Sequence, residues 1–193
     1  MSDAEGRIVV VRHADTEWSA ARRHTGRTDI PLSRAGEAAA IAARPKLADV
    51  DPALVLASPL HRAWRTAELL GLQPERDDDL LEWDYGSYEG RTTAEIRETL
   101  GDPGWDVWDT TSGLGETVDA VGERTARVLA RCAPVVAAGG TAVLVAHAHV
   151  LRILTAVHLG LPAERGRSFA LGPAGVGVLA HERETPVIAG WNL

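Results

Sequence analysis

The chain has 193 residues, the length of one domain, and its 45% hydrophobic residues suffice for one sizeable core. Its formal net charge of −7 excludes the broad basic surface with which proteins bind nucleic acid or anionic membranes non-specifically. Its one cysteine, Cys132, excludes an internal disulfide and a cysteine-based metal cluster, and its alanine-rich surroundings indicate a buried apolar residue.

An unbroken apolar run at residues 8–11 opens the chain and predicts a buried parallel strand. Arg12 and His13 follow directly, where the chain leaves the strand, and this edge of an open α/β sheet is where such folds bind ligands. An arginine binds an oxyanion bidentately, and a histidine is a nucleophile or a base near neutral pH. We therefore expect Arg12 to hold a phosphate and His13 to attack its phosphorus.

Residues 20–32 contain glycine and proline and are typical of a loop. Ser33 is placed to cap a helix, and the alanine-rich run behind it favours helix to about residue 48. Pro45 is expected to bend or shorten that helix, because a proline lacks the N–H group that a helix interior needs.

A second apolar run at residues 54–57 predicts another buried strand, and it ends in Ser58 and Pro59. A serine hydroxyl caps a helix and proline fits its first position, so we expect a helix from here to Leu70. Arg62 then lies about one turn into that helix, near the free N–H groups and the positive dipole end that favour an anion. Arg62 is either a second arginine on the same phosphate or a solvated surface side chain.

Residues 73–90 are irregular and acidic, and the run Asp77, Asp78 and Asp79 is typical of a solvated loop. Glu82 follows it among apolar neighbours. An apolar shell favours the protonated form of a carboxyl, which would make Glu82 a general acid that protonates a leaving alkoxide. The alternative is an ordinary solvated loop glutamate.

A short helix is expected at residues 92–100. The stretch 101–115 is rich in glycine and proline around two tryptophans, Trp105 and Trp108. These tryptophans either contact an apolar part of a substrate or simply pack against the rest of the protein.

A long helix is expected over residues 116–133, with Pro134 as its end or as a kink. A third apolar run at residues 141–146 predicts a strand that also ends on a histidine, His147, and a helix is expected at residues 148–159 behind it. His147 is either structural or, beside a phosphate, a group that stabilises charge on the equatorial oxygens.

Two further strand candidates lie near the end of the chain, at residues 176–181 and 185–189. Strands that alternate with helices predict right-handed crossovers and a mostly parallel sheet covered on both faces, a three-layer α/β/α sandwich. The polar residues after the three apolar runs then share one edge of the sheet, where ligands bind. No repeat or low-complexity linker interrupts the chain, so we expect one domain over residues 1–193.

Metal, cofactor and membrane signals are missing from the sequence. Nothing resembles the carboxylate pair or the glycine-lysine loop that hold magnesium with a nucleotide, so we expect no metal and no cofactor. No window approaches about 18 consecutive apolar residues, and the short acidic start has no apolar signal segment. We expect a cytoplasmic monomer or homodimer with no nucleic-acid or membrane partner.

Five motifs in order, RHADTEW, SPLHRAWRTA, EWDYGSYEG, GLGETV and AHAH, resemble those of the histidine phosphatase superfamily, the phosphoglycerate-mutase-like group. The resemblance runs from about residue 8 to residue 155 and implies a phosphoglycerate-mutase-like fold. It implies His13 as the phosphorylated nucleophile, with Glu82 as proton donor and acceptor. It also implies a phosphate pocket formed by Arg12, Arg62 and His147.

The resemblance implies further substrate-binding positions around this pocket, namely Thr16, Ser19, Thr25, Gly26, Tyr85 and Ala148. In two places the chain departs from the family pattern, which has glycine after each of the two pocket histidines. Ala14 and Ala148 stand there instead. Because alanine adds a methyl group and disfavours positive φ, either loop is expected to be slightly displaced.

The resemblance is closest to the small, broad-specificity acid-phosphatase-like members. Mutases of the family carry a basic insertion that grips a carboxylate, whereas residues 86–112 here offer only Arg91 and Arg97 among six acidic side chains. We therefore expect hydrolysis of a small phosphorylated substrate. Two alternatives are a 2,3-bisphosphoglycerate-dependent phosphoglycerate mutase and a phosphate-dependent binding protein without turnover.

Three further arginines, Arg22, Arg23 and Arg27, lie in the loop that follows the first motif. They either read a second phosphate or carboxylate of the substrate or are solvated surface side chains.

Overall fold

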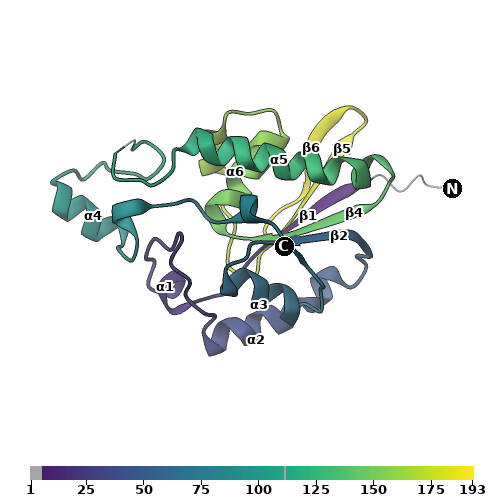
Figure 1. The fold of residues 1–193 in the computed structure, drawn as a ribbon, viewed down its shortest axis with the longest axis horizontal. Coiled ribbons are helices and arrows are strands. Elements are labelled where there is room, and N and C mark those ends of the chain that lie inside the picture. Colours follow the sequence, from purple (N-terminus) through teal and green to yellow (C-terminus); the bar gives the residue numbers. More distant parts are fainter. Residues whose placement is uncertain (1–5, 111) are drawn as a thin grey trace.

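A six-stranded sheet lies at the centre of the computed structural model, which describes residues 6–110 and 112–193 (Figure 1). Residues 1–5, where no signal segment is expected, lie outside the described residues. The strand order across the sheet is β3 (Glu75–Arg76), β2 (Pro52–Ala57), β4 (Thr141–Ala146), β1 (Arg7–Arg12), β5 (Val176–Glu182) and β6 (Thr185–Gly190). The first four strands in this order run parallel, and β5 pairs antiparallel with both β1 and β6, which confirms the mostly parallel sheet.

Helices cover both faces of this sheet. In Figure 1, α5 (Val118–Ala137) and α6 (Ala148–His158) lie above the sheet, and α2 (Arg34–Ala42) and α3 (His61–Leu69) lie below it. This arrangement is the expected three-layer α/β/α fold. Two shorter helices, α1 (Glu17–Ala20) and α4 (Thr93–Leu100), lie beyond one end of the sheet, at the left of the figure.

The first strand, β1, is buried on both of its faces. Ile8 and Val10 belong to the apolar core on the α5 and α6 side, whereas Val9 and Val11 belong to the core on the α2 and α3 side. Successive side chains of a strand point to opposite faces, so burial on both sides requires an apolar residue at every position. Each buried valine or isoleucine contributes roughly 1.5–3 kcal/mol, which holds the end of this strand in a fixed place.

The start of α3 differs from the expectation that Ser58 caps it. The helix begins at His61, and its N-cap is Leu60. The backbone N–H of Ser58 still donates to Val145 O at 3.0 Å, so Ser58 continues the strand, and its hydroxyl is hydrogen-bonded to His147. Arg62 is therefore the second residue of the helix and lies closer to the helix start than expected.

Two prolines affect the helices differently. Pro45 lies in a short 3-10 helix (Arg44–Leu47) after α2 ends at Ala42, which confirms the expected shortening. Pro134 lies inside α5, and the helix continues to Ala137, so the end expected at this proline is wrong. The carbonyl of Pro134 still accepts from Ala138 N at 3.2 Å, because a proline lacks only the donor of the helical pattern.

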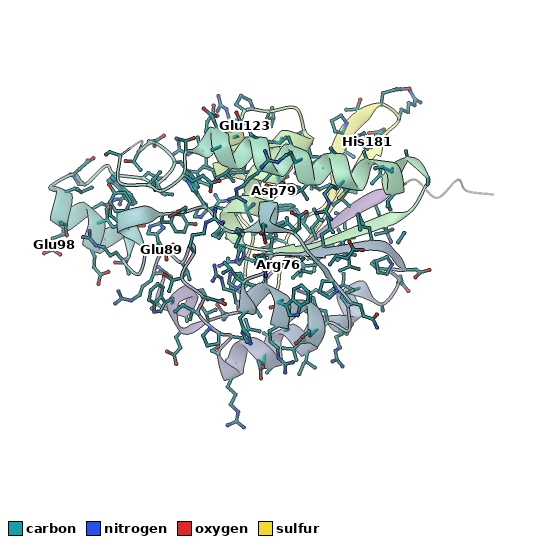
Figure 2. The ribbon with its side chains drawn as sticks, viewed as in Figure 1. Arg76, Asp79, Glu89, Glu98, Glu123 and His181 are labelled. Atoms are coloured by element: carbon teal, nitrogen blue, oxygen red, sulfur yellow. The ribbon has the colours of Figure 1, made fainter. Side chains whose placement is uncertain are left out.

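The acidic run before the site is only partly a solvated loop. Asp77 is 4% exposed and accepts a hydrogen bond from Arg131 of α5 at 2.6 Å. Asp79 pairs with Arg127 of the same helix, beside which Figure 2 shows it. The expectation of full solvation is wrong for Asp77, because its partner Arg131 lies 54 residues later in the chain, where a local pattern does not show it.

The remaining short elements are 3-10 turns at Asp78–Leu80, Gly86–Tyr88 and Ala163–Ser168. The expected helix at residues 92–100 is present as α4, with Thr92 and Glu95 forming a reciprocal cap at its start. Of the helices in the described part of the chain, none combines the length and the apolar character that a membrane crossing needs.

Candidate active site

The residues that follow β1, β2 and β4 meet at one edge of the sheet. Arg12 lies in register with Ala146, and Ala57 lies in register with Val145, so the three strands end side by side. His13, Ser58 and His147 are the residues that come next, and all three are buried. The expectation that these junctions share one edge is confirmed.

His13 is held in one tautomer by its own loop. Its Nδ1 lies 2.7 Å from the carbonyl oxygen of Ala14, and because a carbonyl only accepts, Nδ1 carries the proton. Burial, followed by the charges of Arg62 and Arg12, lowers the pKa of His13 well below its ordinary value. The imidazole is therefore neutral, with a lone pair on Nε2, as a nucleophile requires.

His147 is held by two side chains in the opposite tautomer. Its Nδ1 accepts from Arg62 Nε at 3.1 Å, and its Nε2 lies 2.7 Å from the hydroxyl oxygen of Ser58. Because an arginine only donates, Nδ1 is unprotonated and Nε2–H donates to Ser58. Burial lowers the pKa of His147 well below its ordinary value, with Arg62 the next cause.

Arg62 is a buried cation tied to the loop opposite α3. Its Nη1 donates to Thr28 O at 2.9 Å, and its Nη2 donates to Gly26 O at 2.7 Å and to Thr25 O at 3.2 Å. The alternative of a solvated surface arginine is wrong, because the side chain is fully buried. A β-carbon on Gly26 would lie 2.6 Å from the Trp83 carbonyl oxygen, so only glycine lets this loop approach closely.

Arg12 has a free donor. Its Nη1 donates to Leu171 O at 2.7 Å, while its Nε is buried and, within the described residues, has no hydrogen-bond partner. Burial lowers the pKa of Arg12, against the opposing charges of Glu82 and Asp15. An unpaired buried donor is costly, so this N–H favours an oxyanion that accepts a hydrogen bond from it.

Glu82 is 3% exposed, so the alternative of a solvated glutamate is wrong. The apolar shell expected around its carboxyl group is also wrong. Its Oε1 accepts from the backbone N–H groups of Trp83 and Val150, both at 2.9 Å, and its Oε2 accepts from His149 N at 3.1 Å. Two of these donors belong to the first turn of α6, where free N–H groups and the helix dipole favour negative charge.

A wall of aromatic rings lies beside Glu82. Tyr85 shares a hydrogen bond between its hydroxyl group and Nδ1 of His149, a residue to which the sequence assigned no role. His149 packs edge-on against Trp108 with ring centroids 5.0 Å apart. Trp105 and Trp108 are buried, at 5% and 9% exposure, which supports a packing role for both. The repeated histidine of the AHAH motif is the one signal that pointed to His149.

These residues surround a cavity of about 330 Å³. Seven of the expected site residues line it: Arg12, His13, Ser19, Thr25, Glu82, Tyr85 and Ala148. The other four, Thr16, Gly26, Arg62 and His147, lie behind this lining. The lining also includes Arg22, Arg23, His24, His149 and Pro173.

The four residues behind the lining hold it in position. Thr16 is the N-cap of α1 and accepts from Ser19 N, while the Ser19 hydroxyl accepts from Thr16 N at 2.9 Å. The role of Gly26 and Arg62 is to fix the loop that carries Thr25. His147 lies edge-on to His13, with the two ring centroids 5.1 Å apart.

Neither alanine that replaces a family glycine is strained. Among the described residues, Ala14 and Ala148 are not found at positive φ, so the expected cost of alanine in a left-handed conformation does not arise. Ala14 is fully buried, and its N–H donates to Thr66 Oγ1 at 3.1 Å. Ala148 is the first residue of α6, where alanine is well accommodated.

Comparison with known proteins gives matches over most of the chain, to phosphatases and also to probable phosphoglycerate mutases. The model of the histidine phosphatase superfamily (branch 1) matches residues 8–193. An acid phosphatase of Mycobacterium tuberculosis is 36% identical over 179 residues, which are 91% of this chain and 87% of the relative. A sedoheptulose 1,7-bisphosphatase of Saccharomyces cerevisiae is 31% identical over 188 residues, covering 82% of this chain and 69% of the relative.

A solved structure shows the same arrangement of elements. It is that of a mycobacterial glucosyl-3-phosphoglycerate phosphatase in complex with VO3, with 30% sequence identity and a TM-score of 0.85. The match covers 96% of this chain and 98% of that one.

Proposed function

The chain belongs to the histidine phosphatase superfamily and is a phosphatase, and we propose that it hydrolyses small phosphomonoesters through a phosphohistidine on His13. The observation that carries the proposal is that one cavity is lined both by a neutral His13 and by Arg12, whose buried Nε has no hydrogen-bond partner among the described residues. The histidine supplies a lone pair for phosphorus, and the arginine supplies a donor for a phosphate oxygen.

In the first step, the lone pair of His13 Nε2 forms a bond to phosphorus as the bond from phosphorus to the leaving oxygen breaks. The imidazole becomes positive, and the hydrogen bond from Nδ1–H to Ala14 O stabilises that charge. Arg12 and the buried charge of Arg62 offset the negative charge of the transferred group. Protonated Glu82 gives its proton to the leaving oxygen, so the product departs as an alcohol.

In the second step, the Glu82 carboxylate accepts a proton from water as the water oxygen bonds to phosphorus. The bond between Nε2 and phosphorus breaks, which returns His13 to its neutral form and Glu82 to its protonated form. The three backbone donors around Glu82 favour the carboxylate that this step requires.

The mutase alternative gains no support from the stretch 86–112. Arg91 donates to Glu95 O at 2.9 Å, and Arg97 donates to Trp105 O at 2.9 Å. Neither arginine lines the cavity. Neither Arg91 nor Arg97 is therefore placed to bind a carboxylate of the substrate, and we infer that water hydrolyses the phosphorylated enzyme.

The proposal is tested by trapping the intermediate. With a ³²P-labelled phosphomonoester and rapid quenching in alkali, the enzyme is expected to carry an acid-labile label, and His13→Ala is expected to lose both label and turnover. His61→Ala is the matched control, because His61 is exposed and does not line the cavity, and it should behave like the unmodified enzyme. Full hydrolysis by His13→Ala would overturn the assignment.

A further inference from the structure

Two arginines on the cavity wall are not needed for the chemistry at His13. Arg22 and Arg23 follow the short helix α1 and both line the cavity. Arg23 is held in place because its segment pairs with Thr92 at the start of α4 and its Nη1 donates to Gly90 O. Both residues therefore form part of the cavity wall, and the contacts of Arg23 hold this part of the segment in place.

Arg22 adopts an unusual backbone conformation. Its φ is +56°, in the left-handed region that ordinarily selects glycine or asparagine at the end of a helix. Its backbone N–H donates to Ser19 O at 3.0 Å, which closes the turn. A long charged side chain at such a position indicates that the side chain itself has a use, since glycine would form the turn without strain.

The arginines around the cavity differ in how far their charge is already paired. Arg12 and Arg62 face the charge of about −1.5 to −2 that a phosphate monoester carries near neutral pH, and the carboxylates of Glu82 and Asp15 lie near Arg12. Arg23 is partly offset by Glu95 at 3.5 Å. Arg22 is exposed and lines the cavity, and within the described residues no hydrogen bond or ion pair involves its side chain, so its guanidinium donors are free to bind a ligand.

The cavity also has room for more than a phosphate. Its volume of about 330 Å³ lies in the range, about 300–1,000 Å³, of pockets that enclose a whole small ligand. Arg27 is separate from this group, because it pairs with Glu116 at 3.5 Å and does not line the cavity.

We propose that the cavity selects phosphomonoesters whose alcohol part carries a second anionic group, a carboxylate or a further phosphate, which Arg22 binds with help from Arg23. The inference rests on the proposed function in that the first phosphate is the one attacked by His13. It deepens that function by naming the class of substrate.

The test compares substrates that differ only in the second anion. One pair is ethyl phosphate and 2-phosphoglycolate, which tests a carboxylate, and the other is fructose 6-phosphate and fructose 1,6-bisphosphate, which tests a phosphate. In at least one pair, the unmodified enzyme should prefer the doubly anionic member on the order of tenfold in kcat/KM, and Arg22→Gln should abolish most of that preference. The substrate pair whose preference is lost in Arg22→Gln shows whether the second anionic group is a carboxylate or a phosphate.

Two further variants separate the effect of the Arg22 charge from the effects of net charge and of backbone strain at residue 22. Arg34→Gln removes the same charge from an exposed position on α2 outside the cavity, and it should leave the preference unchanged. Arg22→Gly relieves the left-handed strain, so it should keep the melting temperature and still lose the preference. A preference that is equal in the unmodified enzyme and Arg22→Gln, or absent in both pairs, would overturn the inference.

Calorimetry measures how tightly His13→Ala binds the same four compounds. This measurement tests the second-anion site independently of turnover, so the two proposals can fail separately. If His13→Ala retains turnover, the proposed function fails, while the loss of affinity on adding Arg22→Gln still tests the second-anion site. If the intermediate forms on His13 but the doubly anionic compounds bind no tighter than their partners, the proposed function stands and this inference fails.

Discussion

His13 donates from Nδ1 to the carbonyl oxygen of Ala14 at 2.7 Å, and this bond leaves its Nε2 as the free nucleophile. Because burial and the neighbouring arginines lower the pKa of His13, the side chain stays neutral as the pH falls through 6.5. We predict that protonation of His13 causes no fall in kcat/KM near pH 6.5, and that the fall due to His13 comes at a pH well below this value.

The measurement is kcat/KM from pH 4.5 to pH 8 with p-nitrophenyl phosphate and with an alkyl phosphate. An inflection due to ionisation of the substrate moves between the two compounds, whereas one due to His13 stays in place. An inflection near pH 6.5 that is common to both substrates would contradict the prediction.

The buried histidines also predict how stability depends on pH. His13, His147 and His149 each have a pKa lowered well below 6.5, with burial the largest cause. Between that lowered pKa and 6.5 the unfolded chain binds more protons than the folded one, so stability is fully present above pH 6.5 and is lost below it. In this pH range, each such histidine makes the free energy of unfolding fall by up to about 1.4 kcal/mol for every unit by which the pH is lowered.

Urea unfolding at pH 7.0, 6.0 and 5.5 measures this fall. His149→Gln should reduce the pH dependence of the free energy of unfolding by about the contribution of one histidine. His61→Gln, which removes an exposed histidine, should leave it unchanged. A free energy of unfolding that is constant over this interval would contradict the prediction.

The sequence was sufficient for five of the six strands and for the residues at the ends of β1, β2 and β4, but it missed the two-residue edge strand β3 (Glu75–Arg76), which lies in the stretch expected to be irregular. The sheet buries both faces of β1 and β4, so each must be apolar at every position, and the first polar residue marks where it ends. Arg12, His13 and His147 were located in this way. The family motifs then supplied Arg62 and Glu82, which the pattern of the residues alone left open.

The contacts that depend on distant elements escaped prediction. The role of Ser58 depends on His147, which lies 89 residues later, and the carboxylate of Glu82 is held by backbone donors 67 and 68 residues later. Asp77 is buried only because α5 places Arg131 beside it. A local pattern reports local propensity and cannot identify such partners.

The hydrogen bonds of Glu82 predict the behaviour of Glu82→Gln. The three backbone donors favour a carboxylate, so loss of the charge should slow hydrolysis of the phosphohistidine at least as much as its formation. With p-nitrophenyl phosphate, whose leaving group needs little protonation, we predict an initial burst of p-nitrophenol followed by slow turnover. Alkyl phosphates should be slowed in the first step as well.

Stopped-flow absorbance measures the burst, and quenched labelling measures the phosphoenzyme. Glu123→Gln is the control, because Glu123 is exposed on α5 (Figure 2) and is not among the residues that line the cavity. An absence of both burst and label accumulation in Glu82→Gln, with the slowing equal for all leaving groups, would remove Glu82 from both proton transfers.

The alanines beside the pocket histidines predict the effect of restoring the family glycine. Ala14 is fully buried at negative φ, so Ala14→Gly loses a buried methyl group and gains backbone freedom in the unfolded chain. We predict that this variant is less stable by about 1–2 kcal/mol and no more active than the unmodified enzyme. Urea unfolding and kcat/KM check this, and a large gain in kcat would show that alanine displaces the loop.

Ser58 gives the most direct test of the tautomer assigned to His147. Ser58→Ala removes the acceptor at 2.7 Å from Nε2–H and leaves a buried donor unpaired, which costs about 1–3 kcal/mol in the free energy of unfolding. Ser87→Ala is the control, since this exposed serine bonds Gly113 O at 3.1 Å and its loss should change stability by under about 0.5 kcal/mol.

A double-mutant cycle separates the contribution of the hydrogen bond between His147 and Ser58 from the effect of each substitution on packing. In His147→Phe the donor is already gone, so adding Ser58→Ala should cost less than it does in the unmodified protein. The difference should be about 1 kcal/mol, the net contribution of one buried hydrogen bond. Strict additivity would mean that Ser58 and His147 do not interact, and the assignment of the proton to Nε2 would then fail.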